Sequence, residues 1–179
     1  MKGRVLASPK GLNIRPTSDK VREAIFNIIG QDLSGLRVID LFAGTGSLGL
    51  ETLSRGALHA LFIDNSQQSI NLVRRNLSLC GHEHAGVTLR RNLKKGIPRR
   101  HPMLKEKFDL AFLDPPYRKN LIPLLLEDIS TEDVLTSKAR VIVESWKTDK
   151  FQVSCRFLKM VDTRLYGDTR ISIYTCEAK

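Results

Sequence analysis

The sequence predicts an α/β fold with a doubly wound, mostly parallel sheet and helices on both of its faces. Two observations support this class. Short β-rich runs alternate with helical stretches along the chain, and a glycine-rich turn joins the first clear strand to a helix. The 179 residues suit one domain that buries its own core, so we expect residues 1–179 to form a single domain. Residues 1–30 are expected to extend it as an N-terminal hairpin and helix.

The predicted helices share an apolar spacing of three and four residues. In the first, over residues 17–29, Val21, Ile25 and Ile29 fall on one face behind a polar cap. The helix that opens at Ser66 has the same pattern and is expected to stop at Gly81. A shorter helix is expected at about 47–55, and residues 121–135 are expected to be helical at least in part.

The predicted strands are runs rich in β-branched and aromatic residues. They span residues 37–41, 60–63, 87–91, 108–113, 140–144, 157–163 and 171–175. The last two strands are expected to be joined through Tyr166-Gly167-Asp168. In a doubly wound sheet ligands bind at the carboxyl ends of the strands, so the residues that follow each strand are the candidates for function.

Charge and composition narrow the function classes. The chain has 29 Lys and Arg against 19 Asp and Glu, a net charge of +10, which suits a polyanionic partner such as nucleic acid or simply a basic surface. No apolar run is long enough to cross a bilayer, and the N-terminus leads into no signal-peptide pattern, so we expect a cytoplasmic protein without membrane contact. The three cysteines are widely spaced and indicate no zinc or other metal site.

A glycine-rich turn follows the first strand. Gly44, Gly46 and Gly49 satisfy G-x-G-x-x-G, and Asp64 ends the next strand, where an acid can accept hydrogen bonds from a ribose diol. However, Asp40 closes the strand before the turn, and its carboxylate would repel a pyrophosphate. It suits a ligand that carries an amino group, so S-adenosylmethionine is the expected cofactor. A nicotinamide cofactor, or a tight turn without a ligand, is the alternative.

The sequence Asp114-Pro115-Pro116-Tyr117 directly follows the fourth strand and is the predicted catalytic turn. The exocyclic amine of a purine is a poor nucleophile because its lone pair is delocalised into the ring. Asp114 and the carbonyl of Pro115 can accept both amine hydrogens, and Tyr117 can stack on an unpaired base. Two prolines after a strand can also simply end it.

Four stretches resemble the RsmD-type methyltransferases, which methylate the N2 amine of a guanine in small-subunit (16S) ribosomal RNA with S-adenosylmethionine. Residues 15–27 (R-P-T-S-D-K-V-R-E-A-I-F-N) are similar to the N-terminal signature of the family, and residues 40–51 to its cofactor turn. Residues 114–117 resemble its catalytic turn, which adenine-N6 methylases share, and residues 166–169 resemble its closing hairpin. The resemblance implies a Rossmann-like sheet of seven strands whose last strand is antiparallel.

The resemblance also implies roles for individual residues. The N-terminal extension, with Thr17 and Asp19, would lie near the cofactor and the catalytic turn. The family tends to carry Asp at the position of Asn92, whose side-chain oxygen can still accept a hydrogen bond from the adenine amine, so we expect weaker cofactor binding. Phe42 can either contact the cofactor or pack under the adjacent helix. The full set of expected cofactor-binding residues is Thr17, Asp19, Asp40, Phe42, Ala43, Gly44, Gly46, Asp64, Asn65 and Asn92.

A basic group is expected to contact RNA. It comprises Arg4, Lys10, Arg15, Lys20 and Arg22. The family usually has an extra strand before Lys2, so part of its RNA-contacting hairpin is expected to be missing here.

These observations together predict an S-adenosylmethionine-dependent guanine-N2 methyltransferase that acts as a monomer on ribosomal RNA or a small-subunit particle. Two alternatives use the same sequence features: an adenine-N6 methyltransferase of DNA or RNA, and a catalytically inactive RNA-binding or ribosome-assembly protein. A nicotinamide-dependent oxidoreductase is a further alternative.

Overall fold

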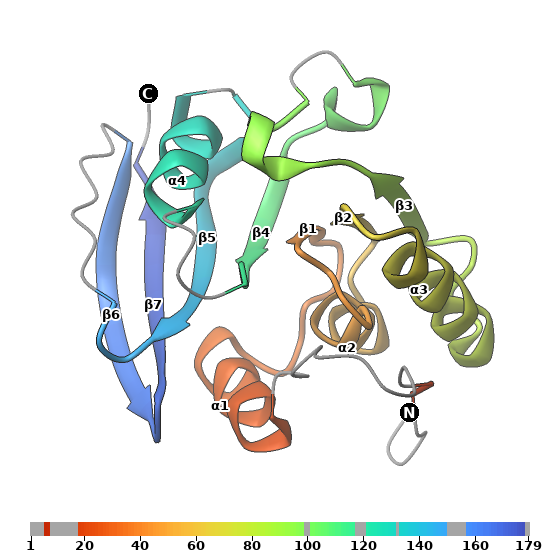
Figure 1. Ribbon diagram of the computed structural model, residues 1–179, viewed down its shortest axis with the longest axis horizontal. Coiled ribbons are helices and arrows are strands. Elements are labelled where there is room, and N and C mark those ends of the chain that lie inside the picture. The colour runs from red at the N-terminus through yellow and green to blue at the C-terminus, as the bar shows by residue number, and fades with distance from the viewer. Residues whose placement is uncertain are drawn as a thin grey trace. The chain divides into compact units, whose positions relative to one another are not determined.

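The computed structural model describes residues 6–7, 18–98, 101–116, 121–131, 133–149 and 157–177. Within them, seven strands form one mixed sheet, together with four α-helices and two short 3-10 helices (Figure 1). The strands are β1 (Arg37–Leu41), β2 (His59–Asp64), β3 (Gly86–Arg90), β4 (Phe108–Leu113), β5 (Leu135–Trp146), β6 (Leu158–Tyr166) and β7 (Thr169–Cys176). The helices are α1 (Asp19–Ile29), α2 (Ser47–Ser54), α3 (Gln67–Cys80), η1 (Leu93–Lys95), η2 (Pro102–Leu104) and α4 (Leu121–Thr131).

The chain divides into two compact units, Met1–Arg91 and Asn92–Lys179. In the first unit the strands are parallel in the order β3-β2-β1, with Val38 opposite Ala60 and Ala60 opposite Gly86. Helices α2 and α3 pack against these strands. The carboxyl ends of β1 and β2 are therefore neighbours, as expected for consecutive parallel strands joined by a helix.

In the second unit the strands follow the order β4-β5-β7-β6. Strands β4 and β5 are parallel, whereas β7 lies between β5 and β6 and is antiparallel to both. The turn at Gly167 joins β6 to β7, as the sequence predicts. The expectation of a mostly parallel sheet with an antiparallel last strand is confirmed.

The ends of two helices follow from local chemistry. The Ser18 hydroxyl accepts a hydrogen bond from the Val21 N–H at 3.3 Å and caps α1, and Ser66 caps α3 in the same way through the Ser69 N–H. Helix α3 ends at Gly81, whose φ of 72° is the left-handed conformation that glycine adopts most readily. Ser18 therefore provides the polar cap that the sequence predicts for the first helix.

Residues 121–135 are helical in part, as expected, but the strand predicted over residues 140–144 begins earlier and ends later. The helix α4 ends at Thr131, and β5 extends from Leu135 to Trp146. Leu135 is buried and pairs with Phe108, and the register shifts between Phe108 and Leu110. The polar residues that follow Leu135 and the left-handed Lys138 (φ 72°) interrupt the alternation by which a strand is recognised in a sequence.

The hairpin expected at the start of residues 1–30 falls outside the described residues, apart from Leu6 and Ala7. In the described part of the chain, none of the helices has the length and apolar character required to span a bilayer.

Candidate functional site

The glycine turn of the first unit is held by hydrogen bonds between its own backbone and the end of β2. The N–H groups of Phe42 and Ala43 both donate to the Ile63 carbonyl, each at 3.0 Å, and the Gly46 N–H donates to the Ala43 carbonyl at 2.7 Å. Gly44 and Gly46 have positive φ angles of 56° and 79°. The sequence expectation of a tight turn at these glycines is met because only glycine adopts this conformation without steric cost.

Phe42 departs from that pattern because it has a bulky side chain and a φ of 69°. Such a conformation costs of order 1–3 kcal/mol and is found mainly where the surrounding structure requires it. Its side chain is half-buried, and its neighbour Ala43 is buried. The turn therefore contains a strained residue at one of the positions expected to meet the cofactor.

Asp40, at the carboxyl end of β1, is almost completely buried, with 1% of its surface exposed. One of its oxygens accepts a hydrogen bond from the Gly49 N–H in the first turn of α2, at 3.1 Å. Gly46, the residue before the helix, has no side chain to perform this capping role. Burial raises the pKa of Asp40 to about 7 from 3.8; the Gly49 N–H opposes this rise, and the charge of Asp64 adds to it.

Asp64, at the carboxyl end of β2, joins the turn to the next loop. Its Oδ2 accepts a hydrogen bond from the Gly44 N–H at 2.9 Å, and its Oδ1 accepts one from the Ser66 N–H at 2.8 Å. Asn65 beside it is exposed, and its carbonyl accepts a hydrogen bond from Arg90 Nε at 3.3 Å. The structure thus brings Asp40, Asp64 and the glycine turn together at one end of β1 and β2.

The third glycine of the motif has a packing role. A Cβ on Gly49 would lie 2.3 Å from Cε1 of Phe62, a residue of β2 that is fully buried. Gly46 is less tight, because a Cβ there would lie between 3.2 and 3.4 Å from side-chain atoms of Val73, Leu50 and Phe62. Gly49 therefore allows α2 to lie close to the sheet, which sets the position of the turn.

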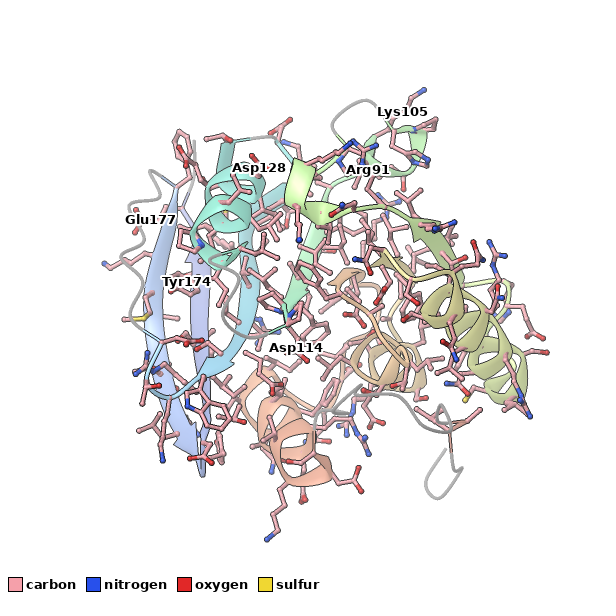
Figure 2. All side chains as sticks on the ribbon, in the orientation of Figure 1. Arg91, Lys105, Asp114, Asp128, Tyr174 and Glu177 are labelled. Carbon is pink, nitrogen blue, oxygen red and sulfur yellow. The ribbon has the colours of Figure 1, made fainter. Side chains whose placement is uncertain are left out.

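In the second unit, Asp114 follows β4 directly, as predicted, and Figure 2 shows it at the end of that strand. Asp114 is half-buried, Pro115 is buried and Pro116 is exposed. Tyr117 lies outside the described residues.

Asn92 has a local role in the second unit. Its Oδ1 accepts a hydrogen bond from the Lys94 N–H at 3.0 Å and caps η1, while the residue itself is exposed. The oxygen expected to accept from an adenine amine therefore already has one backbone donor. A carbonyl oxygen has two lone pairs, so a second donor can be accommodated.

Of the expected N-terminal residues, Asp19, Lys20 and Arg22 lie in α1. Arg22 Nη2 is 2.9 Å from Asp19 Oδ1, and Asp19 is 90% exposed in this surface ion pair. Lys20 is exposed. The other N-terminal candidates, Arg4, Lys10, Arg15 and Thr17, lie outside the described residues.

Two buried polar residues were missed by the sequence prediction. Asn76 in α3 is fully buried, and its amide donates to the Thr45 carbonyl within the glycine turn at 3.0 Å. Glu144 is 6% exposed and follows Val143, which pairs with Leu113 just before Asp114. The available signal was a polar residue at an apolar position of a helix or strand. Among the described residues, no three His, Cys, Asp or Glu side chains are grouped so that they could hold a metal ion.

The sequence matches the model of a protein family over residues 1–175; the family is described as Conserved hypothetical protein 95. The chain belongs to this family. Its membership agrees with the resemblance found in the N-terminal signature and in the two turns.

Individual relatives are similar to this chain over most of their own length. YlbH of Bacillus subtilis (strain 168), named as a candidate rRNA methyltransferase, is 35% identical over 175 residues, which cover 97% of this chain and 94% of YlbH. Ribosomal RNA small subunit methyltransferase D of Haemophilus influenzae is 32% identical over 148 residues, 82% of this chain and 75% of that protein. The solved structure of yhhF from Escherichia coli, described as a candidate methyltransferase, has a TM-score of 0.82 at 28% identity and covers 99% of this chain and 94% of yhhF. The Rossmann-like methyltransferase fold is thereby confirmed.

Proposed function

We propose that this chain transfers the methyl group of S-adenosylmethionine to the N2 amine of a guanine in small-subunit ribosomal RNA. The observation that carries the proposal is the sequence Asp-Pro-Pro-Tyr directly after β4, in a chain that is similar to a small-subunit rRNA methyltransferase. The choice of guanine and its N2 amine is more specific than the turn chemistry requires, because the same chemistry serves any exocyclic purine amine.

The residues of the glycine turn fit S-adenosylmethionine better than a dinucleotide. The Gly49 N–H, in the first turn of α2, donates to Asp40, whereas a pyrophosphate would require such groups for itself. Asp40 offers a negative charge to an ammonium group, and each oxygen of Asp64 has a further lone pair for a ribose hydroxyl beyond its bond to Gly44 or Ser66. The cofactor would supply a methyl group activated by the sulfonium charge.

Asp114 and Pro115 would prepare the acceptor. A carboxylate oxygen of Asp114 and the Pro115 carbonyl accept the two N2 hydrogens, which localises the nitrogen lone pair on its outward side. In-line attack forms the N–C bond as the C–S bond breaks, so most of the rate acceleration comes from orientation. The amine then carries a positive charge and loses one proton to solvent. Tyr117 would stack on the extruded base and offset part of the few kcal/mol that base flipping costs.

The basic N-terminal residues Arg4, Lys10, Arg15, Lys20 and Arg22 would bind RNA phosphates, and Thr17 and Asp19 would lie near the cofactor.

We infer that a monomer carries out the reaction, because both turns belong to the same polypeptide, and that residues 1–179 act as one cytoplasmic methyltransferase domain. Size-exclusion chromatography with light scattering tests the monomer: a dimer at assay concentration would contradict it.

Nucleoside mass spectrometry tests the reaction. Purified protein is incubated with S-adenosylmethionine and with small ribosomal subunits or their naked RNA, and we expect N2-methylguanosine. A methylated adenosine would establish the adenine alternative instead. The absence of any product from a protein that binds the RNA would favour the inactive RNA-binding protein.

The variant Asp114→Ala separates catalysis from binding. We expect product formation to fall by about 100-fold or more, as when a positioned polar group is removed from a reacting centre. The affinity for S-adenosylhomocysteine should remain that of the parent protein. Asp133→Asn is the control for loss of an aspartate charge in the second unit, because Asp133 forms a surface ion pair with Lys107 and has a left-handed φ of 55° that asparagine also adopts.

A further inference from the structure

Asn76 makes three hydrogen bonds to two segments that are far apart in the sequence. Its Nδ2 donates to the Thr45 carbonyl at 3.0 Å and to the Ala7 carbonyl at 3.2 Å. Its Oδ1 accepts from the Ala7 N–H at 2.8 Å. Asn76 has no exposed surface, although it lies in a helix whose other inward residues are mainly apolar.

The geometry of this contact is specific. The N–H and the carbonyl of Ala7 both form hydrogen bonds with the side-chain amide of Asn76, as two paired residues of antiparallel strands do. Because only backbone groups of Ala7 take part, the contact does not depend on the side chain at position 7. The two hydrogens of Nδ2 are divided between Ala7 and Thr45, and Thr45 stands between the two left-handed glycines of the turn. Displacement of either carbonyl would leave a buried donor unpaired, so the amide holds both segments together.

We propose that Asn76 is a positioning residue that couples the N-terminal segment to the cofactor turn, so that cofactor binding strengthens RNA binding. The inference rests on the proposed function, in which the turn at Gly44 and Gly46 binds the cofactor and Lys10 and Arg15, which follow Ala7, bind RNA. A ligand that fixes the turn fixes the Thr45 carbonyl, and through Asn76 it fixes the backbone of Ala7. By linkage, RNA must strengthen cofactor binding by the same factor.

The coupling is measured as the ratio of RNA dissociation constants without and with saturating S-adenosylhomocysteine. The probe is a transcript of small-subunit ribosomal RNA, followed by fluorescence anisotropy. In the parent protein we expect RNA to bind about five-fold tighter or more with S-adenosylhomocysteine. The reverse measurement, calorimetric titration of S-adenosylhomocysteine with and without RNA, must give the same factor.

Two variants break the contact from opposite sides. Ala7→Pro removes the N–H that donates to Asn76 at a half-buried position, and Asn76→Leu replaces the amide by an apolar group of similar volume. We expect the ratio of RNA dissociation constants to fall to about one in each variant. The double variant should show no further decrease, because both changes remove the same contact. Ala7→Pro still decides the matter if Asn76→Leu fails to fold.

Matched controls make the same chemical changes without breaking the contact. Ala7→Ser retains both backbone groups, and Asn71→Leu places the same substitution on the exposed face of α3. Both should retain the parent ratio. A parent ratio of one, or a parent-like ratio in Ala7→Pro, would overturn the coupling. The product of the parent enzyme is read separately: if it is not N2-methylguanosine, the proposed substrate is wrong, while the binding ratio still tests Asn76.

Discussion

Asp64 and Gly44, twenty residues apart, are joined by a hydrogen bond of 2.9 Å from the glycine N–H to the carboxylate. The same carboxylate also accepts the Ser66 N–H, so one side chain holds the glycine turn and the start of α3 in a common position. The residue proposed to bind the cofactor ribose therefore also supports the turn that would surround the cofactor.

Replacement of Asp64 should weaken cofactor binding. In Asp64→Asn one oxygen can still accept a backbone N–H, but the charge and one acceptor are lost. We expect the dissociation constant of S-adenosylhomocysteine to rise about ten-fold or more, measured by calorimetry, because hydrogen bonds to charged groups contribute about 1.5–3 kcal/mol. Asp133→Asn is the control, and equal affinities of the two variants would contradict the ribose role of Asp64.

The pH dependence of cofactor affinity should follow Asp40. Its pKa is raised to about 7, mainly by burial, so the carboxyl group is largely protonated below that pH. A cofactor ammonium group favours the ionised form, and affinity should therefore increase as the pH rises through about 7. In Asp40→Asn this part of the pH profile should disappear. Calorimetry at about pH 6 and about pH 8 provides the measurement, and a profile unchanged by the substitution would refute the assignment.

The same titration has the opposite effect on the stability of the free protein. Between the ordinary value of 3.8 and the native value of about 7, the folded state retains a proton on Asp40 that the unfolded state has released. The contribution of Asp40 to the free energy of unfolding is therefore fully present below about pH 4 and is lost as the pH rises through about 7. Urea unfolding of the parent and of Asp40→Asn across this window should show a difference that changes with pH.

Substitution of Gly49 should destabilise the first unit through a steric clash. A Cβ would lie 2.3 Å from Cε1 of Phe62, and we expect Gly49→Ala to lower the free energy of unfolding by about 1–3 kcal/mol, measured in urea. Phe62→Leu removes the ring atoms that clash. In that background the added cost of Gly49→Ala should be smaller, and an equal cost in both backgrounds would exclude the clash as the cause.

Substitution of Asn92 by Asp should tighten cofactor binding. Aspartate retains an oxygen for the Lys94 N–H and adds a charge that strengthens a bond from the adenine amine. We expect S-adenosylhomocysteine to bind about three- to ten-fold tighter. Asn71→Asp, an exposed change in α3, controls for the added negative charge, and an equal gain in this control would assign the effect to charge alone.

Tyr117 should act through its ring and not through its hydroxyl. Tyr117→Phe retains a face on which a base can stack, so kcat/KM for RNA should stay near the parent value. Tyr117→Ala should lose about 1–3 kcal/mol of transition-state stabilisation, the range measured for base stacking. Steady-state kinetics of the two variants distinguish the roles, and equal losses would point to the hydroxyl.

Local patterns in the sequence determined most of the elements. The strands Arg37–Leu41 and Phe108–Leu113 begin and end where the sequence predicts, because continuous apolar runs bounded by polar residues mark buried strands. The predicted start of β5 was misplaced. Leu135 belongs to the strand because it pairs with Phe108, and no pattern in the neighbouring sequence indicates that pairing. The glycine turn and the placement of Asp114 directly after β4 could be predicted because each group of residues is contiguous in the chain.

The amino-acid order by itself determined the family, the fold class and the identity of the residues at the ends of β1, β2 and β4. Tertiary structure decided the contacts of the site. Asp40 caps α2, Gly49 leaves room for the ring of Phe62, and Asn76 forms hydrogen bonds with both Thr45 and Ala7. Periodicity reports neighbours within a few positions, whereas the partners of Asn76 lie 31 and 69 residues away. Such contacts exist only after the strands and helices have packed, because packing alone brings those atoms within hydrogen-bond distance.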